Sequence, residues 1–83
     1  MNISILSPTG EIYQGKITSV QLPGKTGLFE VLANHAPMVA ALGQGTGRII
    51  NTDGKKMAFT IEGGFVEVLK NEVSLLVRGY QAK

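Results

Sequence analysis

The sequence predicts an all-β fold, a flattened β-sandwich or barrel of about eight to ten short strands. Eleven glycines divide the 83 residues, about twice the usual share of glycine. Between them lie short runs of β-branched and aromatic residues in which apolar and polar side chains alternate, as in half-buried strands. The best helical candidate, EVLANHAPMVAAL, contains Pro37, which would break a helix and push the preceding residue towards extended geometry. We therefore expect no long helix.

The N-terminal part of the chain is expected to form two or three strands. The first lies in NISIL, where Ile3 and Ile5 share one face. A turn follows at Pro8-Thr9-Gly10, because proline presets the φ angle of a turn corner and glycine tolerates positive φ. One long strand or two come next in EIYQGKITSVQL, with an interruption at Gly15. A glycine inside a strand is typical of a bulge or bend, so we expect the alternation to change phase there.

Two hairpins are predicted in the second half of the chain. The first turns at Asp53-Gly54, a pair that suits a tight type I′ turn between strand-like runs. The second turns at Lys70-Asn71, because asparagine tolerates the left-handed conformation. Between them, Gly63-Gly64 would permit a sharp bulge or the close approach of another backbone. The segment MVAAL, residues 38–42, fits either a buried strand or a single helical turn.

Composition excludes several classes of function. The chain has no cysteine, which rules out disulfides and cysteine-based metal or nucleophilic sites. Its net charge is only +2 and its basic residues are spread out, unlike the clustered basic face of a nucleic-acid-binding protein. No apolar run approaches the ~20 residues needed to span a bilayer, and the N-terminus lacks the features of a signal peptide. Charged residues make up 17%, below the roughly 25% that is typical, which favours a surface partly covered by a partner.

One short stretch, LPGKTG, resembles the end of a phosphate-binding loop. The full motif needs a glycine five residues before the Gly24-Lys25 pair, and that position is Ser19. A helix should then begin at Lys25-Thr26 to hold the phosphates, but Gly27 and a strand-like run follow. We therefore predict a hairpin turn with an exposed lysine. The glycines of residues 43–47, GQGTG, have the wrong spacing for a dinucleotide fingerprint, and we expect a flexible bend there.

His35, the single histidine, is the remaining candidate for chemistry. A general base needs a nucleophile or second acid–base group beside it, and a metal ion needs further ligands. The nearest acidic residue in sequence is Glu30, and the six acidic residues are scattered. We expect instead an irregular bend over residues 34–37, in which Asn34 and His35 hydrogen-bond to backbone groups; a contact with a partner is the alternative. No catalytic residue, metal site or cofactor is predicted.

Taken together, three motifs resemble the N-terminal β domain of the epsilon subunit of F-type ATP synthases. In chain order they are ISILSPTGEIYQGKITSVQLPGKTGLFEVL, NHAPMVAALGQGTGRI and IEGGFVEVLKNEVSLLV, and they cover essentially the whole chain. The chain departs from the family pattern at Glu30 and Ala33, where many relatives have Gly and Pro, and at Arg78-Gly79-Tyr80. Many members continue into a C-terminal helical hairpin, which binds ATP in some of them. We expect one β-sandwich domain, residues 1–83, without that hairpin, so neither ATP binding nor hairpin inhibition is carried over.

The resemblance implies a mechanical function. It implies a non-catalytic rotor subunit of the central stalk that links the gamma subunit to the membrane c-ring and helps couple ion translocation to ATP synthesis. The rest of the catalytic sector would be a further partner, and the location would be peripheral, on the cytoplasmic face of a bacterial inner membrane. The implied c-ring contacts are Pro23, Gly24, Lys25, Thr26, Gly27 and Leu28. The implied contacts near the stalk interface are Asn34, His35, Ala36 and Pro37.

Two other classes of function remain as alternatives. A small β-barrel that binds single-stranded nucleic acid would need two or three aromatic side chains exposed on one sheet face, beside a basic groove. Of the five aromatic residues, Phe59 and Phe65 are expected in the core. The others are Tyr13, Phe29 and Tyr80. A nucleotide-binding enzyme has only the Gly-Lys-Thr triplet in its favour.

Overall fold

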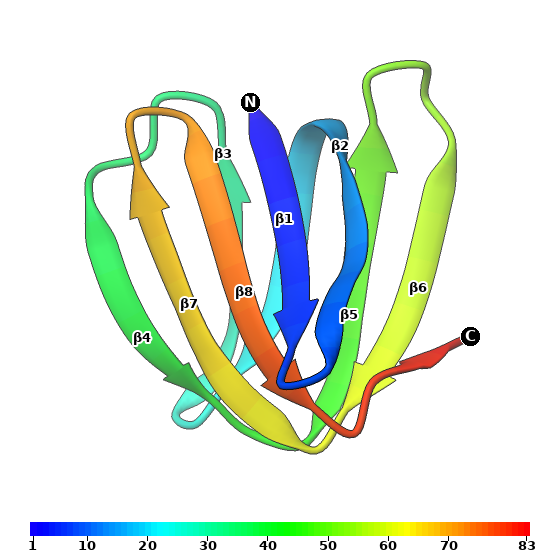
Figure 1. Cartoon of the computed structure of the whole chain (residues 1–83). Helices are drawn as coiled ribbons and strands as arrows, with labels where there is room; N and C mark the ends of the chain where they lie inside the picture. Colours follow the sequence, from blue (N-terminus) through cyan, green and yellow to red (C-terminus); the bar gives the residue numbers. More distant parts are fainter.

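The computed structural model describes all residues, 1–83, and every regular element in it is a strand (Figure 1). The all-β prediction is therefore confirmed, with nine strands. They are β1 (Asn2–Ser7), β2 (Gly10–Gly24), β3 (Gly27–Leu32), β4 (Met38–Leu42), β5 (Gly45–Asn51), β6 (Lys56–Ile61), β7 (Gly63–Leu69), β8 (Glu72–Arg78) and β9 (Gln81–Ala82). The segment MVAAL, for which a strand and a helical turn were both open, is strand β4. A membrane-crossing helix is not among the elements.

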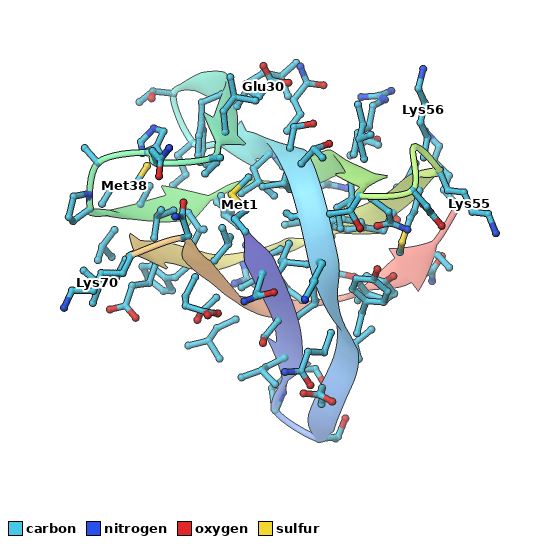
Figure 2. The ribbon with its side chains drawn as sticks, turned by 90° about the horizontal axis from the view of Figure 1, so that it is seen from above. Met1, Glu30, Met38, Lys55, Lys56 and Lys70 are labelled. Atoms are coloured by element: carbon cyan, nitrogen blue, oxygen red, sulfur yellow. The ribbon has the colours of Figure 1, made fainter.

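The strands form two layers joined by the long strand β2. One layer has the order β4-β7-β8-β1, and β1 pairs with the first half of β2. The second half of β2 pairs with β3 on one side and with β5 on the other, and β5 continues to β6 and β9. Figure 2 shows β2 running across the molecule between the layers. Most neighbours are antiparallel, and the β1–β8 pair is parallel.

The core lies between the two layers and draws on eight of the nine strands. Each strand contributes the side chains of its inward face, as the period-2 alternation predicts. Phe59 is the largest of the fully buried side chains. The core residues are Ile3, Ile5, Ile17, Val20, Leu22, Val31, Leu42, Ile49, Phe59, Ile61, Val66, Val68, Val73, Leu75 and Val77.

The predicted interruption of β2 at Gly15 is wrong, because the pairing with β1 runs unbroken through that residue. The register shifts instead at two other residues: Ile12 is left out opposite β1, and Thr18 is left out between Ile17 and Ser19 opposite β5. A bulge increases twist and bends a strand, which suits the point where β2 passes between layers. Gly15 has another role: a Cβ there would lie 2.6 Å from the hydroxyl of Tyr13.

Both predicted hairpins are present, but the first has a different turn. A type I′ turn needs positive φ at both central residues, and at Asp53-Gly54 only Gly54, at 85°, has it. Three residues, 52–54, lie inside the closing bond from the Asn51 amide to the Lys55 carbonyl. The second hairpin has φ values of 51° at Lys70 and 63° at Asn71, the type I′ pattern. Asparagine and lysine thus occupy positions that glycine usually fills.

The predictions for the two glycine-rich segments, residues 43–47 and Gly63-Gly64, have different outcomes. The flexible bend expected over residues 43–47 is wrong for most of its length, because strand β5 begins at Gly45. Gly47 is buried within β5, and a Cβ there would overlap the ring of Phe59. The close backbone approach expected at Gly63-Gly64 is confirmed, because a Cβ on Gly64 would collide with the carbonyl oxygen of Leu76 on β8.

Candidate functional site

The turn between β2 and β3 contains most of the predicted c-ring contact. Gly24 pairs with Gly27, so Lys25 and Thr26 form a two-residue turn and are both exposed. The Lys25 amide donates to the Ala41 carbonyl at 3.3 Å. Pro23 is buried, Leu28 is exposed, and strand β3 follows where a phosphate-binding loop would have a helix. The predicted hairpin turn is therefore confirmed, and the phosphate-loop interpretation fails on geometry.

The bend between β3 and β4 contains the second predicted contact, residues 34–37. The His35 amide donates to the Leu32 carbonyl at 3.2 Å. The His35 ring is half-buried, and its Nδ1 lies 2.7 Å from the Ala36 carbonyl oxygen. A carbonyl can only accept, so Nδ1 carries a proton and donates this hydrogen bond. The expected hydrogen bond from His35 to the backbone is confirmed.

A pair of asparagines attaches this bend to the β7–β8 turn. The backbone amide of Asn34 donates to Oδ1 of Asn71 at 2.7 Å, and Nδ2 of Asn71 donates to Oδ1 of Asn34 at 3.2 Å. Both residues have positive φ, 65° and 63°. The expected bond from the Asn34 side chain to a backbone group is replaced by this side-chain pair. The bend is thereby held against the layer that contains β7 and β8.

The two predicted contact regions lie at opposite ends of the molecule. Figure 1 places the β2–β3 turn at the lower end and the β3–β4 bend at the upper end, beside the β7–β8 turn. Only strand β3, Gly27–Leu32, separates them in the chain. The structure therefore does not bring the two sets of residues into one site. It places them so that two different partners could bind at the same time.

An apolar outer face on β4, β7 and β8 is the site feature that the sequence analysis missed. Val39 is 71% exposed, Phe65 57% and Leu76 56%, and Leu69 is also exposed. The expectation that Phe65 lies in the core is therefore wrong. Phe65 is paired with Ala41 of β4 on one side and with Leu76 of β8 on the other. The three most exposed apolar side chains of this face thus lie on adjacent strands.

A signal for this face was present in the sequence. Apolar residues are consecutive in β7, at Phe65-Val66 and Val68-Leu69, and in β8, at Leu75-Leu76-Val77. Successive side chains of a strand point to opposite faces, so consecutive apolar residues supply both the core and the outer face. Large exposed apolar patches are typical of interaction sites. The shared face of these strands is therefore the strongest candidate for a docking surface.

Three shallow hollows follow one another along this face. The first, about 290 Å³, extends from Pro37 in the bend to Leu69. The second, about 210 Å³, lies between Val39 and Leu76, and the third, about 270 Å³, continues to Pro8 in the β1–β2 turn. Neighbouring hollows share lining residues. Val39 lines the first and the second hollow, and Phe65 and Leu76 line the second and the third. The apolar face is thus uneven and continuous with the His35 bend.

The opposite layer has a hollow of about 340 Å³ on its outer face. Small side chains, Ser19 and Ala58, lie among the longer chains of Gln21, Arg48 and Lys56. Glu30 also lines it, and Figure 2 shows Glu30 on the side away from Lys70. This face is mixed in charge, and its large exposed aliphatic side chains, Leu28 and Leu32, lie on strand β3 rather than around the hollow.

The aromatic side chains do not form a surface for stacking nucleotide bases. Phe59 is fully buried, and Tyr80 stacks on it with ring centroids 5.3 Å apart and planes inclined by 24°. Burial, with a smaller contribution from Tyr13, raises the pKa of the Tyr80 hydroxyl. Phe65 is the one aromatic among the large exposed apolar residues. The arrangement therefore does not supply the two or three exposed rings that a single-stranded nucleic acid would need.

The side chains also provide little for metal or acid–base chemistry. No group of three or more His, Cys, Asp or Glu side chains is placed to hold a metal ion. His35 directs one ring nitrogen to a neighbouring carbonyl, with no carboxylate among its hydrogen-bond partners. The candidate site is therefore a set of surfaces: the β2–β3 turn, the β3–β4 bend and the apolar face.

Comparison with known proteins gives a consistent result. The family model described as ATP synthase, Delta/Epsilon chain, beta-sandwich domain matches residues 1–82. An ATP synthase epsilon chain of Leptospira borgpetersenii is 44% identical over 77 residues, which cover 92% of this chain and 59% of the relative. The chain thus spans about three fifths of the length of that relative.

Solved structures show the same fold at low sequence identity. A chain in the cryo-EM structure of the Euglena gracilis mitochondrial ATP synthase, OSCP/F1/c-ring, matches with a TM-score of 0.90 at 23% identity. The matched region covers 96% of this chain and 51% of the Euglena gracilis chain. A chain of the Tetrahymena thermophila mitochondrial ATP synthase central stalk and c-ring matches with a TM-score of 0.80 at 17% identity, covering 98% and 65%.

Proposed function

The chain belongs to the β-sandwich domain family of ATP synthase delta and epsilon chains, and from this premise we propose that it is a non-catalytic subunit of a rotary ATP synthase. In this proposal it lies in the central stalk, binds the gamma subunit and the c-ring, and helps couple ion translocation to ATP synthesis. It would be peripheral to the membrane, on the cytoplasmic face of a bacterial inner membrane. The observation that carries the proposal is the exposed apolar face on a member of this family.

We assign the gamma subunit to the apolar face and the adjoining bend, residues 34–37. Burying a Val, Leu or Phe side chain contributes about 1.5–3 kcal/mol, so Val39, Phe65 and Leu76 together could supply a large part of a stable contact. Their hollows lead directly to Pro37. Because Asn71 holds the bend against this layer, His35 and the apolar face would meet the partner as one surface.

We assign the c-ring to the β2–β3 turn at the other end of the molecule (Figure 1). Lys25 and Thr26 are exposed there and can contact polar or acidic groups, and Leu28 adds an exposed apolar side chain beside them. Hydrogen bonds from Lys25 to Ala41 and from Gly43 to Pro23 hold the turn against the end of β4. A turn fixed in this way can transmit force to the apolar face through β4.

The arrangement fits a part that transmits torque. A rotor subunit must hold two partners at once and resist shear between them. Here the β3–β4 bend and the β2–β3 turn lie at opposite ends of the molecule, the apolar face extends between those ends, and a core of fifteen buried apolar residues lies between the layers. Close-packed interiors have low compressibility and transmit strain. No bond-making step is needed for this function, in agreement with the absence of any predicted catalytic residue.

Co-expression with the gamma subunit tests the proposal. We expect the wild-type chain to purify with gamma as a stable complex, and Phe65→Glu to reduce its affinity at least a hundredfold. The matched control is Gln21→Glu, which adds the same charge to the outer face of the opposite layer and should leave the complex intact. Failure of the wild-type chain to bind gamma would contradict the proposed function. Equal binding by both variants would place the contact elsewhere.

A further inference from the structure

Two carboxylates lie on the apolar outer face: Glu72, at the β7–β8 end, accepts a hydrogen bond from Asn2 at 3.0 Å, and Glu67 lies near the middle. Along β7 its outward neighbours are Phe65 and Leu69, both exposed. Across the sheet Glu67 pairs with Val39 of β4 and with Ser74 of β8. Its side chain lines both the hollow that begins at the His35 bend and the hollow that follows it. A partner that covers the apolar side chains must therefore also cover this carboxylate.

Glu67 has no partner of its own within the chain. None of the side-chain hydrogen bonds of the molecule involves it. The cation of the same face, Arg78, lies over Gly63, four residues away along β7 and hence roughly 13 Å distant. Lys70, in the neighbouring turn, points away from the body of the molecule in Figure 2. The carboxylate is therefore solvated by water alone.

Docking of a purely apolar partner would remove that water and leave a buried, unpaired charge, which is strongly unfavourable. We infer that the partner surface carries a basic side chain, arginine or lysine, that pairs with Glu67 inside an otherwise apolar contact. This inference rests on the proposed function, in which the partner is the gamma subunit. The hollows on either side of Glu67, about 290 and 210 Å³, have apolar walls that suit the aliphatic stem of such a side chain.

The pair would determine the register of the complex. Exposed apolar side chains on a sheet permit several relative positions of a partner, whereas a desolvated charge pair is satisfied in one. The carboxylate also disfavours wrong partners. A surface without a cation at this position would remove the water from Glu67 and offer no opposite charge in return. Glu67 is thus a specificity-determining residue of the face, while Phe65 and Leu76 supply contact area.

Binding of the purified chain to purified gamma subunit, measured by surface plasmon resonance at several salt concentrations, tests the inference. Glu67→Gln keeps the shape of the side chain and removes its charge. We expect affinity to fall about tenfold to a hundredfold, chiefly through faster dissociation, as for a buried charge pair that loses one partner. Glu67→Lys should lose more. The control, Glu30→Gln, removes a charge from the opposite layer and should bind as the wild type does.

The outcomes separate this inference from the proposed function. Weaker binding by Glu67→Gln, with the thermal midpoint and the Glu30→Gln affinity unchanged, would support the pair. Wild-type affinity and dissociation rate for Glu67→Gln would overturn it while leaving the gamma assignment in place. A wild-type chain that does not bind gamma would overturn the proposed function, and the inference with it.

Discussion

The outer faces of the two layers differ although their inner faces are alike. Both layers send alternate aliphatic side chains into one shared core. Outside, β4, β7 and β8 present Val39, Phe65 and Leu76 on adjacent strands, whereas β2 and β5 present Gln21 and Arg48 and the exposed leucines of that layer are confined to β3. The inner side chains form the core, and we expect the half-exposed side chains of the outer face to add little to the stability of the isolated chain. This difference supports the proposal that the outward apolar residues of β7 and β8 contact another molecule.

Truncating the neighbouring leucines Leu75 and Leu76 of β8 should show the difference between the inner and outer faces most clearly. Leu75 is fully buried and Leu76 is 56% exposed. We expect Leu75→Ala to lower the free energy of unfolding by about 2–5 kcal/mol, because it leaves a cavity in the core. Leu76→Ala should change it by no more than about 0.5 kcal/mol, as for most surface positions. Urea unfolding followed by circular dichroism measures both, and similar losses would show that the outer face stabilises the fold.

A smaller effect on stability is expected from a substitution at Asn71, which holds the bend of residues 34–37 against the β7–β8 turn. Asn71→Gly keeps a residue that favours positive φ and removes both hydrogen bonds to Asn34. A hydrogen bond contributes about 0.5–1.5 kcal/mol, so the Asn34 amide should exchange with solvent several-fold faster. The thermal midpoint should stay within a few degrees. Hydrogen exchange by NMR provides the measurement, with the Lys25 amide as internal control. Unchanged exchange at Asn34 would mean that the bend holds its shape alone.

The smallest effect concerns the other layer, in which Tyr80 stacks on Phe59 near β6. Burial raises the pKa of the Tyr80 hydroxyl above its ordinary value of 10.0. A raised folded-state pKa means that the folded chain holds the proton more tightly than the unfolded chain. The associated stability is complete below pH 10 and is lost as the pH rises through the folded-state pKa. Urea unfolding from pH 8 to 11 should therefore show a decline that is shallower in Tyr80→Phe. Parallel curves would exclude Tyr80 as its source.

Several parts of the fold and site follow from local sequence. The alternation around Ile3 and Ile5 predicts an inward face, and both are fully buried. The turn at Lys70-Asn71 follows from the tolerance of asparagine for positive φ, and its φ of 63° agrees. The missing first glycine at Ser19 is enough to reject a phosphate loop. These features depend on interactions within a few residues, so short windows of sequence contain the information.

The fold class, most of the turns and the family could thus be predicted from the sequence. The bulge at Thr18, the exposure of Phe65 and the hydrogen bond between Asn34 and Asn71 were visible only in the folded structure. Each of these depends on pairing between residues far apart in the chain. Pairing is decided by cooperative packing of whole strands, and a shift of one residue in register moves every side chain to the other face. Local propensity does not determine the register. Phe65 and its buried neighbour Val66 therefore cannot be assigned to the outer or the inner face until the pairing of the strands is known.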